Sequence, residues 1–173
     1  MTGVNEPLLD DDAHERSAPS KGDANLGERI KRLVAEESYG VLCTQSQGQP
    51  YGSMIAFAFT EDLSTALFAT SRFTRKYQIL TECKRVAIVV NNRDKFPSDL
   101  NKIEAITVTG RSAEIQRDST DSRLVDLLVQ KHPHLKSFIT SPSTAVFRVN
   151  VVRYFHVHRF QEVREWVPEV SKD

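Results

Sequence analysis

The sequence predicts a mainly β protein with flanking helices (α+β), in which an antiparallel sheet of six to seven strands closes into a barrel. Two observations support this prediction. First, strand-like apolar segments follow one another through short turns, and short turns join antiparallel neighbours because parallel strands need a long crossover. Second, a sheet with this many strands, one of them long and bent at a glycine, removes its exposed edges by closing on itself.

Length and composition are those of one globular domain. The chain has 173 residues, of which 39% are hydrophobic and 27% are charged. Its formal net charge is zero, so no large basic field attracts nucleic acid or an anionic membrane. No apolar run approaches the roughly 20 residues that span a bilayer, and the two cysteines, Cys43 and Cys83, do not make a disulfide framework. We expect a cytoplasmic protein.

The N-terminal part divides into a tail and a helix. Residues 1–24 are polar, acidic and without periodicity, which predicts a disordered acidic tail, and residues 25–173 are expected to form a single domain. A helix is predicted to start at Asn25, which can cap it, with Glu28 at the capping-box position. Its apolar side chains form one stripe, made of Leu26, Ile30, Leu33 and Val34.

Strands follow in hairpin order. Segments 39–45 and 51–60 are strand-like and are joined by SQGQP, which has the glycine and proline of a hairpin turn. A turn at 61–64 leads into a third strand at 65–70. The run RVAIVV at 85–90 is continuously apolar, as expected for a strand that is buried on both faces.

The C-terminal half continues this pattern. A long alternating strand is predicted over 105–116, and Gly110 within it indicates a bend or bulge. The leucine-rich segment 119–132 is predicted to be a helix that stops before Pro133. Segment 143–166 is expected to hold two or three further strands.

An unusual charge pattern marks the helix predicted to begin at Thr74. Arg75 and Lys76 add two cations to a first turn that already carries the positive end of the macrodipole, an arrangement that a bound anion would stabilise. Thr70 and Ser71, which end the preceding strand, add further donors. An isolated Thr-Arg-Lys is more typical of a solvated helix start. Its position after Thr-Ser somewhat strengthens the alternative, a phosphate site at which Arg and Lys would make charge-assisted hydrogen bonds.

The order of these pieces resembles the FMN-binding split-barrel proteins, the superfamily of pyridoxamine 5'-phosphate oxidase. The resemblance covers roughly residues 26–166, and its most specific parts are GQPYGSMI and the Ser/Thr-Arg-Lys at the helix start. It implies a split β-barrel that works as a homodimer, with FMN bound in clefts between the subunits. It further implies three sets of cofactor contacts: the phosphate with Thr74, Arg75 and Lys76, the flavin ring with backbone groups of Ser53, Met54 and Ile55, and the ring edge or ribityl chain with Thr70 and Ser71.

The chain departs from pyridoxamine 5'-phosphate oxidase itself where that enzyme holds its substrate. The strand that begins with an arginine and ends with a lysine in the enzyme has Ser53 and Ala58 here, and a flavin-contacting glutamine aligns with Ala105. The C-terminal Arg/Trp elements are not clearly present, despite Trp166. The chain therefore looks more like a flavin-nucleotide-binding branch of the superfamily than like the vitamin-B6 oxidase.

Several functions fit this resemblance. The first is an FMN-dependent oxidoreductase of unknown substrate, whose cofactor carries the redox chemistry and which needs no protein nucleophile. The second is a flavin carrier or sensor without turnover. The third is a haem-binding or haem-degrading protein, and a further variant would use F420 in place of FMN.

Two histidines are candidate ligands in the haem interpretation. His156 and His158 alternate on a predicted strand and so point to one face. No Cys, Asp or Glu stands beside them at ligand spacing, and Glu162 is the nearest carboxylate. Imidazoles on a solvent or dimer face are the simpler interpretation, and we expect no metal site.

Overall fold

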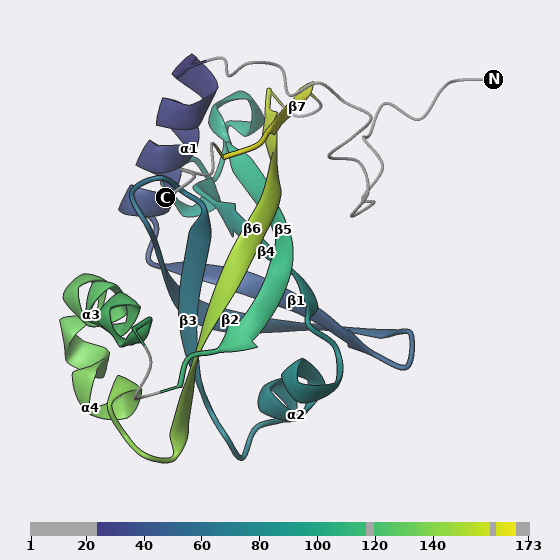
Figure 1. The fold of residues 1–173 in the computed structure, drawn as a ribbon. Helices are drawn as coiled ribbons and strands as arrows, with labels where there is room; N and C mark the ends of the chain where they lie inside the picture. Colours follow the sequence, from purple (N-terminus) through teal and green to yellow (C-terminus); the bar gives the residue numbers. More distant parts are fainter. Residues whose placement is uncertain (1–23, 117–119, 160–161, 169–173) are drawn as a thin grey trace.

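The fold is an antiparallel barrel of six strands with a seventh strand added at one edge. The computed structural model describes residues 24–116, 120–159 and 162–168. The strands run β3-β2-β1-β4-β5-β6-β7, and a further pairing between β3 and β6 closes the first six into the barrel (Figure 1). Every neighbouring pair is antiparallel, so the predicted fold class is confirmed.

The observed strands follow the predicted order, and the helix predicted over 119–132 is a single helix that is followed by a separate short one. The strands are β1 (Tyr39–Ser46), β2 (Gln49–Phe59), β3 (Thr65–Ser71), β4 (Arg85–Asn91), β5 (Ala105–Glu114), β6 (Thr144–His158) and β7 (Glu162–Trp166). The α-helices are α1 (Ala24–Glu36), α2 (Arg75–Glu82), α3 (Ser122–Lys131) and α4 (Lys136–Ile139). Single 3₁₀ turns are η2 (Arg93–Lys95), η3 (Leu100–Lys102) and η4 (Pro133–Leu135).

Two hydrophobic clusters hold the helices against the barrel. The main cluster fills the barrel interior, and the predicted apolar stripe of α1 joins it, since Leu26, Ile30, Leu33 and Val34 are all buried. A smaller cluster joins α3 and α4 to outward-facing residues of the barrel, through Leu128 and Ile139 on the helices and Ala58, Leu67 and Val146 on the strands. Figure 1 shows α3 and α4 beside β3, with α2 at the same end of the molecule.

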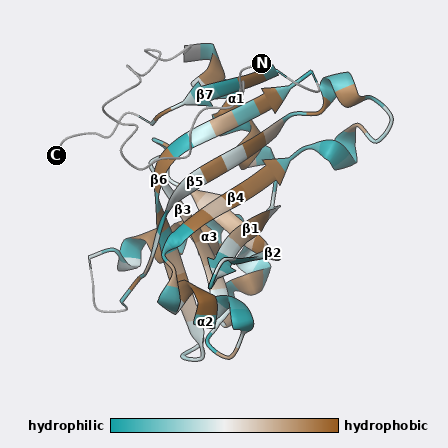
Figure 2. Ribbon diagram, turned by 90° about the vertical axis from the view of Figure 1, so that its right-hand side faces the viewer, coloured by the Kyte–Doolittle hydropathy of each residue, from teal (hydrophilic) through white to brown (hydrophobic). Residues whose placement is uncertain are grey.

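Two local predictions need correction. The first helix begins at Ala24, so Asn25 lies in its first turn and does not cap it. Strand β4 alternates in burial: Val86, Ile88 and Val90 are buried, whereas the residues between them are only partly buried, so burial on both faces is wrong. Hydrophobic and hydrophilic residues also mix along β4, β5 and β6 in Figure 2. The polar segment between β4 and β5 holds two 3₁₀ turns. The predicted acidic tail lies outside the described residues, except for Ala24.

The predicted bulge in β5 is confirmed. The register of the β5–β6 pair shifts between Thr109 and Gly110. A Cβ atom at Gly110 would stand 2.4 Å from the carbonyl oxygen of Asn150 and 2.7 Å from Cγ1 of Val149. The two backbones therefore approach so closely at the bulge that only glycine fits without a shift.

Candidate functional site

The N-terminus of α2 is fixed to the end of β3 by hydroxyl groups. Thr74 is the N-cap residue, as predicted, and its Oγ1 accepts a hydrogen bond from the backbone N–H of Tyr77 at 3.2 Å. The same hydroxyl donates to the carbonyl oxygen of Ser71 at 2.8 Å and lies 3.0 Å from Oγ1 of Thr70. Because Thr74 has one hydroxyl proton, which goes to Ser71, Thr70 is the donor in that contact. The strand end and the helix start thus form one rigid unit.

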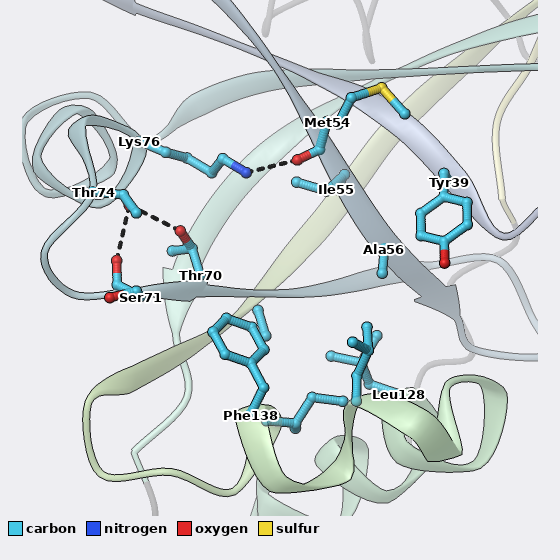
Figure 3. Close-up of a pocket in the computed structure, with 13 residues that line it drawn as sticks. Tyr39, Met54, Ile55, Ala56, Thr70, Ser71, Thr74, Lys76, Leu128 and Phe138 are labelled. Carbon is cyan, nitrogen blue, oxygen red and sulfur yellow. Dashed lines mark hydrogen bonds between the residues drawn. The ribbon is translucent and has the colours of Figure 1, made fainter.

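A cavity of about 420 Å³ opens beside this cap. Figure 3 shows Thr74 and Lys76 at one end of it and Leu128 and Phe138 across from β2 and β3. The lining residues come from the barrel (Tyr39, Met54, Ile55, Ala56, Ala69, Thr70 and Ser71), from the α2 cap (Thr74 and Lys76) and from the α3–α4 region (Leu128, Leu135, Phe138 and Ile139).

Lys76 is the charged residue of this cavity wall, and no acidic side chain lines it among the described residues. Its Nζ donates to the carbonyl oxygen of Met54 at 2.8 Å. Burial lowers the pKa of Lys76, which means that the surroundings do not compensate the charge of its ammonium group. A partly buried cation beside the N–H groups of a helix start favours the binding of an anion.

The rest of the cavity is apolar. The wall formed by Leu128, Leu135, Phe138 and Ile139 faces a barrel surface on which Met54 is 65% exposed. Tyr39 and Phe138 at the cavity are also exposed, at 51% and 41%. Large exposed apolar side chains around one cation suit an amphipathic ligand with a broad apolar part and an anionic end.

Six of the eight predicted cofactor residues line this cavity: Met54, Ile55, Thr70, Ser71, Thr74 and Lys76. Ser53 and Arg75 do not. The Oγ of Ser53 is buried and has no hydrogen-bond partner among the described residues. The guanidinium of Arg75 lies 6.0 Å from the centre of the Tyr51 ring, and the side chain is exposed. Contact between any of these residues and a cofactor stays a prediction.

Sequence reasoning missed the wall that α3 and α4 contribute. Leu128, in the segment predicted to be a leucine-rich helix, both joins the second cluster and lines the cavity. Phe138 lies in a four-residue helix that carries little periodic signal. The available signal was that apolar residues continue beyond Pro133, at Leu135, Phe138 and Ile139.

The two histidines of β6 are buried, so the expectation of a solvent or dimer face is wrong. His156 is fully buried and His158 is 7% exposed, and neither lines the first cavity. The Nε2 of His156 lies 3.3 Å from Oε2 of Glu104, a carboxylate that sequence reasoning missed, and Oε1 of Glu104 accepts a hydrogen bond from Arg29 at 2.7 Å. Burial lowers the pKa of His156, and Glu104 partly opposes this effect.

The position of Glu104 beside His156 follows from the strand register. Ala105 pairs with Val157, so Glu104, just before β5, comes beside the end of β6, and this register is not visible in a single sequence. His158 has its own carboxylate, since its Nε2 lies 3.2 Å from Oε2 of Glu162. Within the described residues, no three His, Cys, Asp or Glu side chains gather as a metal-binding group.

The closed barrel and the cavity at the α2 cap define a split-barrel protein. Residues 26–158 match the family described as Pyridoxamine 5'-phosphate oxidase. The match covers well over half of the chain, so the protein belongs to this family. No curated protein matches the chain. No helix in the described part of the chain is long and apolar enough to cross a membrane.

Solved structures share the fold at low sequence identity. A haem binding protein from Mycobacterium smegmatis has 15% identity and a TM-score of 0.71 over 82% of this chain, which spans only 57% of that protein. General Stress Protein 26 from Bacillus anthracis has 18% identity and a TM-score of 0.63, with 83% of this chain and 98% of that one covered. A FAD-binding protein from Mesorhizobium loti has 14% identity and a TM-score of 0.57, with 75% and 91% covered. Identities this low establish the fold alone.

Proposed function

We propose that this protein binds FMN in the cavity at the start of α2 and acts as an FMN-dependent oxidoreductase. The observation that carries the proposal is Lys76, a partly buried cation at a hydroxyl-rich helix start, opposite an apolar wall. FMN has the matching chemistry, since a phosphate ends a chain that leads to a flat ring system. Family membership supports it as well, because proteins of this family bind flavins.

The residues present fit the phosphate end of FMN. Lys76 supplies a point charge, and the backbone N–H groups of Arg75 and Lys76 have no acceptor within the helix, whereas that of Tyr77 is capped by Thr74. Ser71 and Thr74 stand beside them in the cavity wall. Arg75 would reach the phosphate only after leaving the Tyr51 ring, so we assign it a smaller part than Lys76.

The apolar part of the cavity fits the ring end. Met54 and Ile55 of β2 lie on one side, and Leu128 and Phe138 lie on the other. Bound FMN would supply hydride or electron transfer, and the chain would orient the ring and exclude water. The proposed assembly is a homodimer with FMN at the subunit interface, in which the partner covers the exposed side chains at the cavity.

Haem binding is a second candidate function, supported by the likeness to the haem binding protein from Mycobacterium smegmatis and by the apolar wall. In that case His156 and His158 would not be the ligands of a haem in this cavity, because both are buried elsewhere. F420 is a third possible ligand for the same phosphate-binding features.

An absorption spectrum tests these proposals. The purified protein is mixed with FMN, passed through a desalting column and measured, and haem and F420 are tried in parallel. Retained flavin bands support the proposal, whereas a protein that loses FMN and retains haem contradicts it.

Reduction of the bound flavin by NAD(P)H or another donor then separates an oxidoreductase from a carrier, whose flavin would show no turnover with any donor and acceptor. Size-exclusion chromatography with light scattering tests the homodimer.

A further inference from the structure

A second cavity, of about 690 Å³, lies where α1, the β4–β5 connection and the β6–β7 turn meet. It shares no lining residue with the first cavity. Figure 1 shows α1 and β7 at one end of the molecule and α2 and α4 at the other. Its wall carries six cationic side chains, from α1 (Arg29 and Arg32), from the β4–β5 connection (Lys95 and Lys102) and from the β6–β7 region (Arg159 and Arg164).

Two carboxylates line this cavity, Glu36 and Glu104, and both are already paired with cations. Glu104 accepts a hydrogen bond from Arg29 on Oε1, and its Oε2 faces His156. The Nη2 of Arg32 is 3.8 Å from Oε1 of Glu104, which is too long for a hydrogen bond. Glu104 therefore faces two guanidinium groups. Glu36, one turn further along α1, also attracts Arg32 but is paired with Lys95 at 2.8 Å, so the charge of Arg32, whose side chain is 61% exposed, is only partly balanced.

Arg159, in the β6–β7 region of the same cavity wall, is also only weakly balanced. Its Nη1 lies 3.8 Å from Oε1 of Glu162, whose Oε2 contacts His158 at 3.2 Å. Lys95, by contrast, is balanced by Glu36 and Glu37 at 2.8 and 2.9 Å. The weakly balanced charge of the cavity thus belongs to two arginines from different elements.

We propose that this cavity binds a diphosphate group, either as inorganic pyrophosphate or as part of a nucleoside diphosphate. A guanidinium fork can hold a phosphate through two parallel hydrogen bonds, so Arg32 and Arg159 provide the donors for two phosphates. Asn25 and Asn101 add amide groups to the wall, and Phe96 adds an aromatic surface on which a base can stack. The volume lies within the usual range for small-molecule sites.

Titration with pyrophosphate, ADP and AMP at constant ionic strength tests the proposal. Binding is measured by calorimetry and by the fluorescence of Trp166, the single tryptophan of the chain. Trp166 packs against Gly27 of α1, close to the cavity, so its emission reports on this region. We expect pyrophosphate and ADP to bind more tightly than AMP. We expect Arg32→Gln combined with Arg159→Gln to weaken pyrophosphate binding at least about tenfold, because charge-assisted hydrogen bonds are lost.

Two matched variants locate the binding. Lys76→Met removes the cation of the first cavity, and Arg123→Gln removes an exposed arginine of α3, and both are expected to retain pyrophosphate binding. Loss of binding in Lys76→Met with no effect of the double arginine variant would place the anion in the first cavity and overturn the proposal. Absence of pyrophosphate binding would overturn it as well. So would a heat or fluorescence change with sodium chloride that equals the change with pyrophosphate. A preference for ADP over pyrophosphate indicates a nucleotide, and equal affinity indicates that the diphosphate alone is recognised.

Discussion

Lys76 donates a hydrogen bond from Nζ to the carbonyl oxygen of Met54, 2.8 Å away, and so ties the first turn of α2 to the middle of β2. The dashed line in Figure 3 marks this contact. The bond holds the ammonium group at the cavity without help from an acidic side chain of the described residues. A neutral carbonyl leaves the positive charge uncompensated, so the position stays suited to an anion.

Replacement of Lys76 by methionine is therefore expected to weaken FMN binding by at least about tenfold, or about 1.4 kcal/mol. Arg75→Met is the matched control, because Arg75 has the same charge one residue away but lies against Tyr51 outside the cavity wall. We expect it to have the smaller effect, and the double replacement to weaken binding at least as much as Lys76→Met. Fluorescence titration with FMN measures all three. A larger loss in Arg75→Met than in Lys76→Met would contradict the assignment.

Thr74 is predicted to stabilise the fold through its cap. Thr74→Ala removes the acceptor for the Tyr77 N–H and the donor to Ser71, so it should lower the free energy of unfolding by about 1 kcal/mol. Thr74→Ser keeps the hydroxyl and should unfold close to the wild type. Urea unfolding followed by circular dichroism compares the three proteins. Equal midpoints for the alanine and serine variants would show that the cap contributes nothing to stability.

Gly110 is predicted to tolerate no side chain. Gly110→Ala places a Cβ 2.4 Å from the carbonyl oxygen of Asn150, so the β5–β6 ladder must shift, at a cost of about 1–3 kcal/mol. Gly52→Ala is the control, since its nearest contact would be Cγ1 of Val41 at 3.5 Å, an ordinary distance. Thermal unfolding should show a lower Tm for Gly110→Ala alone. The same Tm for both variants would mean that the bulge relaxes easily.

Lys131 is predicted to make stability depend on alkaline pH. Burial lowers the pKa of Lys131 from 10.5 to about 8, and its Nζ lies 4.1 Å from the centre of the Phe57 ring and donates to the carbonyl oxygen of Val34. Between these two pH values the unfolded chain binds a proton that the folded chain does not, so stability rises with pH. This gain in the free energy of unfolding is fully present above pH 10.5, and it is lost as the pH falls through 8.

Lys131→Met removes this titration and keeps most of the aliphatic stem. Urea unfolding of both proteins below pH 8 and towards pH 10.5 measures the effect. Other groups also titrate at high pH, so the difference between the two proteins is the quantity to compare. Wild-type stability should rise relative to the variant over this range. A difference that is constant with pH would contradict a lowered pKa in the folded state.

The local chemistry of the site was predictable because it depends on neighbours in the chain. Thr74 follows a strand end by a few residues, and an N-cap needs only its own hydroxyl and the first turn of the helix. Gly110 was identifiable for the same reason, since a glycine within an alternating strand indicates a bulge. The order of strands and turns likewise predicted an antiparallel barrel.

The sequence by itself determined the class of fold, the N-cap at Thr74 and the bulge at Gly110, because each depends on short-range periodicity or on one residue's conformational preference. Only the tertiary structure decided that Arg75 lies against Tyr51 while Lys76 reaches Met54, that Phe138 forms a cavity wall, and that Glu104 faces the buried His156. These outcomes depend on strand register and on how helices pack against the barrel. Both are set by the summed burial of distant residues, which no local pattern contains.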